Sequence, residues 1–307
     1  MSTDSAAAPG PAEAKTFPQL IRAAAAAYGD DPAIVLTADT IPDDAATFRE
    51  LDERSALIAK GLIARGVGKG HRVGFIWGNG PQFATILAGI ARIGAIAIPI
   101  STLIKSNELV RVLRQSDVGG LIVQRSLLRN DYAERLCEAL PGLRAGTSPE
   151  LRLPETPFLR WVVSSGEGLP SGILDQSWLT DAGGSVSDAM LRAIESEVHP
   201  TDQMIEIYTS GSMALPKGVK HCHGPAMFRA EYLSRMAGIT RGMEGYAFMP
   251  MFWVGGLMMT LLPNWSAGGR TTCTEGTATS NRMAMGSVLA KEDMAAFAMA
   301  KPYWGWA

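Results

Sequence analysis

The residues best suited to chemistry lie in one short segment, YTSGSMALPKGVKHCHG (208–224). Its first half is rich in hydroxyl groups and glycine, and Lys217 follows. Backbone N–H groups of such a turn converge on phosphate oxygens, and small side chains let the phosphate approach. Hydroxyl donors and a lysine charge strengthen this binding. The segment indicates a phosphate-binding loop, with an ordinary polar turn as the alternative.

Other kinds of site fit these residues poorly. The loop of P-loop NTPases needs Gly-Lys followed by Ser or Thr, whereas here Pro216 precedes Lys217 and a glycine follows it. The HCH triplet (221–223) offers metal ligands, but the only other histidines are His71 and His199, and no second cluster occurs. No G-x-S-x-G stretch supports a serine hydrolase. A metal site at the triplet is therefore disfavoured.

The elements that must hold this loop alternate between strand-like and helix-like patterns, which is typical of an α/β fold. Apolar runs predict strands at 71–77, 95–100, 120–124, 159–166, 203–210 and 245–250. Periodicity and alanine content predict helices at 17–28, 47–66, 82–93, 107–116, 186–198 and 225–237. Thr47 and Glu50 form a capping box, and Ser106 is expected to cap the helix that follows it. The strand 203–210 runs directly into the loop segment.

Composition narrows the class of protein. The chain has 307 residues, of which 47% are hydrophobic and 19% charged, so it can bury a large core. A net charge of −2 gives no basic field for nucleic acid. The longest apolar run, 86–100, is too short for a membrane span and carries Arg92. Three scattered cysteines and a start without a secretory signal lead us to expect a cytoplasmic protein.

The segment 208–224 resembles the phosphate-loop signature of the adenylate-forming superfamily, which includes acyl-CoA synthetases, luciferases and peptide-synthetase adenylation domains. The usual pattern is Y-T-S-G-[ST]-T-G-x-P-K-G-V-x-x-x-H. It is matched at Tyr208, Thr209, Ser210, Gly211, Ser212, Pro216, Lys217, Gly218, Val219 and His223. The stretches 47–83 and 91–100 look like the family's N-terminal part, and PMFWVGGL (250–257) looks like its acyl-pocket segment. The FWVGG portion is more similar to acyl-CoA synthetases than to amino-acid adenylation domains.

The resemblance implies layered α/β sheets with flanking helices, the front part of the large N-terminal domain of an adenylate-forming enzyme. It implies that a fatty or aryl carboxylic acid reacts with ATP to give an acyl-adenylate, which CoA converts to a thioester. The implied phosphate-binding residues are Thr209, Ser210, Gly211, Ser212, Met213, Ala214 and Lys217. Thr209 is also the implied ligand of Mg²⁺. The implied acyl-pocket wall is Trp253, Val254, Gly255 and Gly256, although a tryptophan in an apolar run also suits core packing.

Two departures from the family pattern affect the expected activity. Met213 replaces a threonine and Ala214 replaces a glycine, so one hydroxyl donor to phosphate is lost. The family's later adenine and ribose signatures and its small C-terminal domain are missing from the sequence. We therefore expect a tail over 1–15, a partial AMP-binding large domain over 16–275 and a truncated end over 276–307. A non-catalytic nucleotide- or acyl-binding remnant of the same fold is the alternative function.

Overall fold

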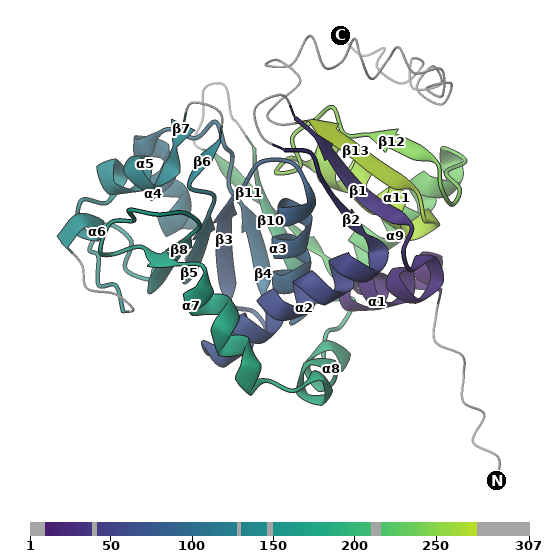
Figure 1. The fold of residues 1–307 in the computed structure, drawn as a ribbon, viewed down its shortest axis with the longest axis horizontal. Helices are drawn as coiled ribbons and strands as arrows, with labels where there is room; N and C mark the ends of the chain where they lie inside the picture. Colours follow the sequence, from purple (N-terminus) through teal and green to yellow (C-terminus); the bar gives the residue numbers. More distant parts are fainter. Residues whose placement is uncertain (1–9, 39–41, 128–129, 146–149, 210–215, 275–307) are drawn as a thin grey trace.

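The computed structural model describes residues 10–38, 42–127, 130–145, 150–209 and 216–274. Figure 1 shows two β-sheets side by side, with helices between them and on their outer faces. The strands are β1 (Pro32–Thr37), β2 (Asp44–Thr47), β3 (Arg72–Ile76), β4 (Ile96–Pro99), β5 (Gly120–Val123), β6 (Ser126–Leu127), β7 (Asn130–Asp131), β8 (Trp161–Ser164), β9 (Leu174–Asp175), β10 (Gln203–Thr209), β11 (Lys217–Cys222), β12 (Glu244–Tyr246) and β13 (Arg270–Thr274).

The helices differ widely in length, and several are single turns. They are α1 (Phe17–Tyr28), α2 (Phe48–Ala64), α3 (Pro81–Ala91), α4 (Ser106–Gln115), α5 (Tyr132–Ala139), α6 (Gly142–Ala145), α7 (Ser177–Thr180), α8 (Asp188–Ser196), α9 (His223–Met236), α10 (Val254–Gly256) and α11 (Leu262–Ala267). Two 3₁₀ turns, η1 (Pro11–Glu13) and η2 (Asp181–Ser185), and a π-helical turn, η3 (Leu257–Leu261), complete the described elements.

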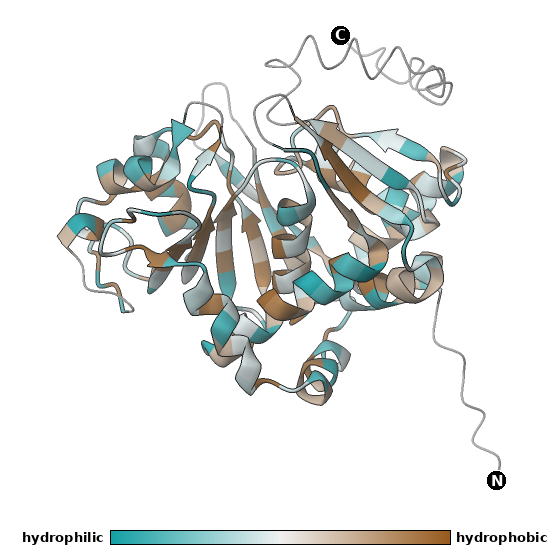
Figure 2. Ribbon diagram, in the orientation of Figure 1, coloured by the Kyte–Doolittle hydropathy of each residue, from teal (hydrophilic) through white to brown (hydrophobic). Residues whose placement is uncertain are grey.

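The larger sheet has seven strands in the order β11-β10-β4-β3-β5-β8-β9. All neighbouring pairs are parallel except β10 and β11, which form an antiparallel hairpin at one edge. Most of its inner strands are apolar along their whole length (Figure 2), as expected for a parallel sheet covered on both faces. The carboxyl ends of the parallel strands lie together along one side of the sheet, which is called the carboxyl edge below and faces the top of Figure 1.

The smaller sheet pairs segments that lie far apart in the sequence. Its order is β12-β13-β1-β2, and β1 runs parallel to β13 with Ile34 opposite Thr271. One hydrophobic core joins this sheet through α1, α2 and α3 to one face of the larger sheet, and includes Phe17, Leu51 and Phe75. A second core covers the other face of the larger sheet with α4 and α5. The two cores make a layered α/β fold, as the sequence predicts.

Most of the predicted elements agree with the structure, and the Thr47–Glu50 capping box is present with both hydrogen bonds. The prediction that Ser106 caps α4 is wrong. Ser106 is the first helical residue, Lys105 holds the capping position, and the Ser106 hydroxyl donates to Glu138 of α5. The contact to α5 explains the shift, because a tertiary acceptor competes with the backbone N–H groups for the serine side chain.

The charge inside the apolar run 86–100 has partners on two other helices. Arg92 follows α3 and is fully buried. Its Nε donates to Glu195 of α8 at 2.6 Å, and its Nη2 donates to Asp52 of α2 at 2.7 Å. Its Nη1 also donates to the Ser55 hydroxyl at 2.7 Å. This network joins α2, α3 and α8 beneath the larger sheet.

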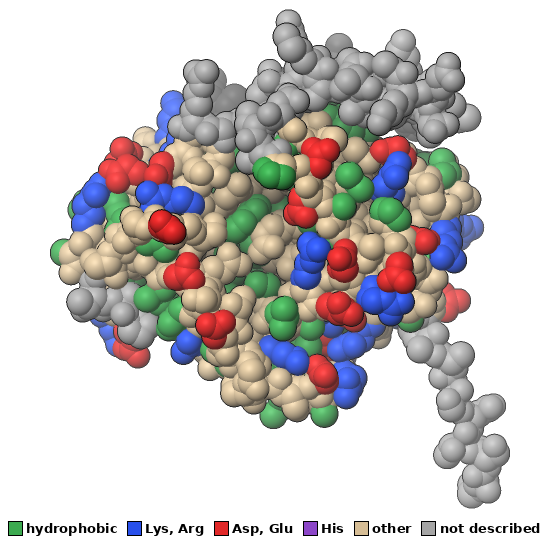
Figure 3. Space-filling view, in the orientation of Figure 1, with side chains coloured by type: hydrophobic (Ala, Val, Ile, Leu, Met, Phe, Trp, Pro, Cys, Tyr) green, Lys and Arg blue, Asp and Glu red, His purple; other side chains and the backbone are tan. Residues whose placement is uncertain are grey.

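The surface in Figure 3 mixes acidic and basic side chains without a field of one sign. Over the described residues, no helix is long and apolar enough to cross a membrane.

Candidate functional site

The predicted phosphate loop connects the two strands of the edge hairpin. Strand β10 ends at Thr209, which pairs with Lys217 at the start of β11. The implied binding residues Ser210, Gly211, Ser212, Met213 and Ala214 lie outside the described residues. The strand predicted to lead into the loop is confirmed, and the two ends of the loop are held opposite each other in register.

The hairpin has the position at which open α/β sheets bind ligands. Strand β10 is parallel to β4, with Ile205 opposite Ala97, so its carboxyl end lies at the same edge as those of β4 and β3. Ligands of such sheets bind in the crevice outside the carboxyl ends of the strands. The loop segment leaves β10 at that edge and returns through β11.

A buried carboxylate fixes the base of the hairpin. Glu206 on β10 is only 5% exposed, and the Tyr208 hydroxyl donates to its Oε1 at 2.9 Å. Burial and the neighbouring Glu206 raise the pKa of the Tyr208 phenol above its usual value, so the phenol keeps its proton. A Cβ at Gly218 would lie 2.1 Å from Glu206 Oε1. A side chain after Lys217 would therefore require the Glu206 carboxylate to shift from its present position.

The second predicted segment, 250–257, reaches the same edge of the sheet. Asn79 follows β3, and its Oδ1 accepts a hydrogen bond from the backbone N–H of Met251 at 2.8 Å. Strand β3 lies two strands from β10, which is about 10 Å at the usual strand spacing. The structure therefore places the end of β10 and the segment 250–257 at the same edge of the sheet. Asn79 was not predicted because its partner Met251 is distant in sequence, and Glu206 was not predicted because its burial depends on the fold.

The implied acyl-pocket residues are partly accessible. Trp253 packs edge-on against Phe252 with ring centroids 5.4 Å apart, and it is half-buried against the main core. Val254 and Gly255 are also half-buried, whereas Gly256 is buried. The packing of the Trp253 ring on the core is observed, and its place in the wall of an acyl pocket stays a prediction.

The two glycines of this segment let the chain fold back on itself. A Cβ at Gly255 would lie 2.0 Å from the Met249 sulfur, and one at Gly256 would lie 2.3 Å from the Pro250 carbonyl oxygen. The helix that follows contains the π-helical turn η3, in which the Thr260 hydroxyl donates to the Gly255 carbonyl oxygen at 3.2 Å. Such turns are frequent at functional sites.

The last residue of the family pattern has a structural role. His223 is fully buried at the junction of β11 and α9, and its Nδ1 accepts a hydrogen bond from the backbone N–H of Phe17 at 3.1 Å. The helix α1 has no side-chain cap from Thr16, so His223 takes that place. Burial lowers the pKa of His223 to about 4, against a small opposing effect of Asp202. The imidazole is therefore neutral at pH 7.

The HCH triplet does not gather a metal-binding set. His221 lies on β11 and His223 begins α9, with the Nδ1 of His223 already bonded to Phe17. Within the described ranges, no group of three or more His, Cys, Asp or Glu side chains is close enough to hold a metal ion.

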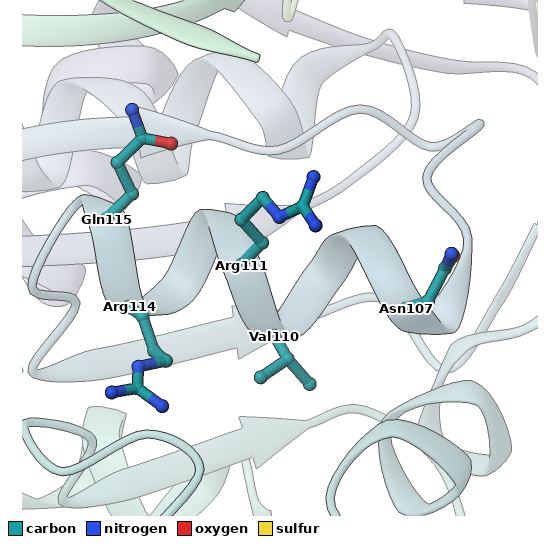
Figure 4. Close-up of a pocket in the computed structure, with 5 residues that line it drawn as sticks. All are labelled: Asn107, Val110, Arg111, Arg114 and Gln115. Atoms are coloured by element: carbon teal, nitrogen blue, oxygen red, sulfur yellow. The ribbon is translucent and has the colours of Figure 1, made fainter. Parts of the chain in front are cut away.

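A shallow hollow of about 420 Å³ on α4 is a poor candidate for the site. It lies on the outer surface of the helix, and Figure 4 shows the side chains of Arg111 and Arg114 leaving the helix on different sides. Their charges do not converge on one point. Asn107, at the other end of the hollow, is exposed.

We expect Asn79→Ala to lower the free energy of unfolding by about 1–3 kcal/mol, since it leaves the buried Met251 N–H without an acceptor. Urea denaturation of the two proteins measures this change. The exposed Asn107→Ala variant is the control and should change stability by less than about 0.5 kcal/mol. Equal effects of the two substitutions would show that Asn79 does not anchor the segment.

Comparisons with known proteins point to one family. A family model described as AMP-binding enzyme matches residues 21–304. The Bacillus subtilis (strain 168) protein YngI is 26% identical over 253 residues, covering 82% of this chain and 46% of its own. Mitochondrial medium-chain acyl-CoA ligase ACSF2 of Mus musculus is 27% identical over 209 residues, 68% of this chain and 33% of its own.

The fold of the chain is also similar to that of solved CoA ligase structures. The anthranilate CoA ligase AuaEII, in complex with anthranoyl-AMP, matches 89% of this chain and 47% of its own, with a TM-score of 0.68 and 22% identity. The chain therefore spans between a third and a half of the length of these proteins.

Proposed function

Because the chain belongs to the AMP-binding enzyme family, we propose that it forms the ATP- and acid-binding part of an acyl-CoA synthetase. The observation that carries the proposal is the meeting of two segments at one sheet edge. The β10–β11 hairpin bears the phosphate-loop residues, and Asn79 anchors the segment 250–257 two strands away. A nucleotide phosphate and the carboxylate of an acid would meet between them.

The proposed reaction has two steps. A carboxylate oxygen of the acid attacks the α-phosphorus of ATP, the bond to pyrophosphate breaks, and an acyl-adenylate forms. The thiol of CoA then attacks the acyl carbon, its proton passes to solvent, and AMP leaves with the bonding electron pair. The carboxylate is a weak nucleophile facing negative charge, so positioning and charge neutralisation carry the catalysis. No general acid or base is assigned among the residues of this chain.

The proposed roles of the hairpin residues follow from their chemistry. The backbone N–H groups of 210–214 and the hydroxyls of Ser210 and Ser212 would bind the β- and γ-phosphates. Lys217, exposed at the start of β11, would add a positive charge at the end of the loop. Bound together with ATP, Mg²⁺ would offset phosphate charge, and Thr209 is its proposed protein ligand.

The proposed substrate is a carboxylic acid with an apolar body, either fatty or aryl. The segment that leads to Trp253 is rich in apolar side chains, and Met251 and Phe252 are buried. Trp253 and Val254 keep accessible surface for such a body. One relative acts on medium-chain acids by its name and one structural neighbour on anthranilate, so both classes of acid remain in the proposal. We also propose that residues 16–275 correspond to part of the family's large domain.

Met213 favours a second candidate function, a nucleotide-binding protein without adenylation activity. Methionine at this position removes a hydroxyl that would donate to phosphate, which is worth about 1.5–3 kcal/mol when the acceptor is charged. Binding of ATP without any acid-dependent chemistry, in wild type and in all variants below, would support this function.

Acid-dependent ATP–pyrophosphate exchange tests the proposal. We expect Met213→Thr to raise the exchange rate by about ten- to a hundredfold over the unmodified chain, with medium-chain fatty acids or benzoate as substrate. Met213→Val is the matched control, because valine has the shape of threonine without its hydroxyl, and it should give no comparable gain. Equal rates in the two variants would rule out the missing hydroxyl as the cause.

The assignment of the nucleotide site has a separate test by calorimetry. Lys217→Met should weaken ATP binding about tenfold, the effect of one charge-assisted contact. Unchanged ATP affinity in Lys217→Met, together with no exchange in any variant, would contradict the proposed function.

A further inference from the structure

A cleft lies at the end of the larger sheet opposite the carboxyl edge, where its parallel strands begin. It has a volume of about 580 Å³ and is formed where β3, β5 and β8 begin, beside α7 (Figure 1). This volume is in the range of small-molecule sites. Strand β3 runs five residues from the cleft to the carboxyl edge, about 16 Å at the usual rise, so the cleft is separate from the candidate site.

The cleft concentrates positive charge that lacks acidic partners. Four arginines line it against two carboxylates: Arg65, Arg72, Arg152 and Arg160 against Asp117 and Glu150. Arg152 and Glu150 form an ion pair, but both side chains are more than 70% exposed, so water screens it. In the described part of the chain, no carboxylate lies within ion-pair distance of the other three arginines.

Two of these arginines are held in place by backbone carbonyl groups. Nε of Arg65 donates to the Trp178 carbonyl oxygen at 3.1 Å, and Nη1 of Arg160 donates to the Pro157 carbonyl oxygen at 2.7 Å. Neutral acceptors orient the guanidinium groups but leave their charges uncompensated. Nε of Arg72 is buried and has no hydrogen-bond partner, which is costly for a charged group.

Aromatic faces lie beside these charges. The Phe158 side chain is 53% exposed at the cleft, so much of its ring is accessible to a ligand. The guanidinium carbon of Arg65 lies 3.9 Å from the ring centroid of Trp178. A planar heterocycle can stack on exposed aromatic rings and guanidinium planes.

We propose that this cleft binds a nucleoside phosphate, at a site distinct from the one at the carboxyl edge. Arginine forks match phosphate oxygens with two hydrogen bonds each, and Arg72 and Arg160 provide them. The base stacks on Phe158 at the rim.

Calorimetric titration of the full chain with ADP tests the proposal. The titrations use the Lys217→Gln background, in which binding at the carboxyl edge is weakened, and the cleft is identified by the ADP binding that Arg160→Gln and Phe158→Ala reduce; ADP binding unchanged by both substitutions would overturn the proposal. We expect one ADP per chain in this background. Arg160→Gln and Phe158→Ala should each weaken that binding at least tenfold, and inorganic phosphate should bind more weakly than ADP.

The matched control is Arg111→Gln on α4, which removes the same charge from an exposed site outside the cleft (Figure 4). It should leave the ADP affinity within twofold. Absence of ADP binding in the Lys217→Gln background overturns the proposal, as does an equal loss in Arg111→Gln and Arg160→Gln. Equal affinity for phosphate and ADP overturns the nucleoside part. The ADP titrations involve neither a carboxylic acid nor pyrophosphate exchange. A negative result for the cleft therefore does not contradict the proposed function.

Discussion

Replacing Arg92 with methionine is expected to lower the free energy of unfolding by about 3–5 kcal/mol, the usual effect of removing one partner of a buried ion pair. The guanidinium is fully buried and bonded to Glu195, Asp52 and Ser55. Methionine would leave the Glu195 carboxylate, itself 6% exposed, with much less compensation. Urea denaturation at pH 7 measures the change.

A second arginine on the same carboxylate provides the control. Arg22 also pairs with Glu195, but its side chain is 37% exposed. Arg22→Met should therefore cost less than about 1 kcal/mol. The double variant Arg92→Met/Glu195→Met should recover most of the loss, because an apolar pair of similar size can replace a buried ion pair. Equal losses of unfolding free energy in Arg92→Met and Arg22→Met would mean that burial of the arginine does not set its contribution to stability.

This network also bears on the candidate site. Arg92 follows α3 directly, and α3 begins two residues after Asn79, whose side chain anchors the segment 250–257. A displaced α3 would move that anchor relative to the hairpin. We therefore expect Arg92→Met to reduce any exchange activity even at temperatures where the chain remains folded.

Protonation of His223 is expected to lower the free energy of unfolding by about 3 kcal/mol when the pH is lowered from 7 to below 4. The pKa of this group is 6.5 in the unfolded chain and about 4 in the fold, so the unfolded state binds its proton first. The contribution of the neutral imidazole is complete above pH 6.5 and is lost as the pH falls between these two values. Urea denaturation at several pH values measures this loss.

An asparagine at the same position separates this effect from general acid denaturation. The Oδ1 of asparagine can accept the Phe17 N–H but does not titrate, so His223→Asn removes the pH dependence and keeps the hydrogen bond. The difference in unfolding free energy between wild type and variant should shrink or reverse from pH 7 to pH 4.5. Parallel pH curves for the two proteins would show that His223 is not the titrating group.

His223 also links pH to the phosphate hairpin. It follows β11 directly, and its backbone N–H is bonded to the Asp202 carbonyl oxygen just before β10. Protonation would disturb the contact to α1 and the open end of the hairpin, opposite the loop, together. The final histidine of the family pattern is therefore explained by packing of the helix α1 and needs no catalytic role.

The longer helices and the inner strands of the larger sheet were predictable, because each depends on local signals. The Thr47–Glu50 capping box and the apolar runs of β3, β4 and β5 are contiguous in sequence and were read correctly. Strand β11 was missed, since Lys217 and Lys220 give it a polar character typical of an edge strand. Strand β1 depends on β13, more than two hundred residues later, and no local pattern reports such a pairing.

The sequence by itself determined the predicted class of site. The order of hydroxyls, glycines and lysine over 208–224 predicts phosphate-binding chemistry, since that prediction depends on residue types and spacing alone. The tertiary structure decided what surrounds that segment. Asn79, Glu206 and the partners of Arg92 act through contacts between residues 12 to more than 170 positions apart, or through burial that composition does not reveal. Burial sets the pKa of a histidine and the strength of an ion pair, and burial exists only once the chain is folded.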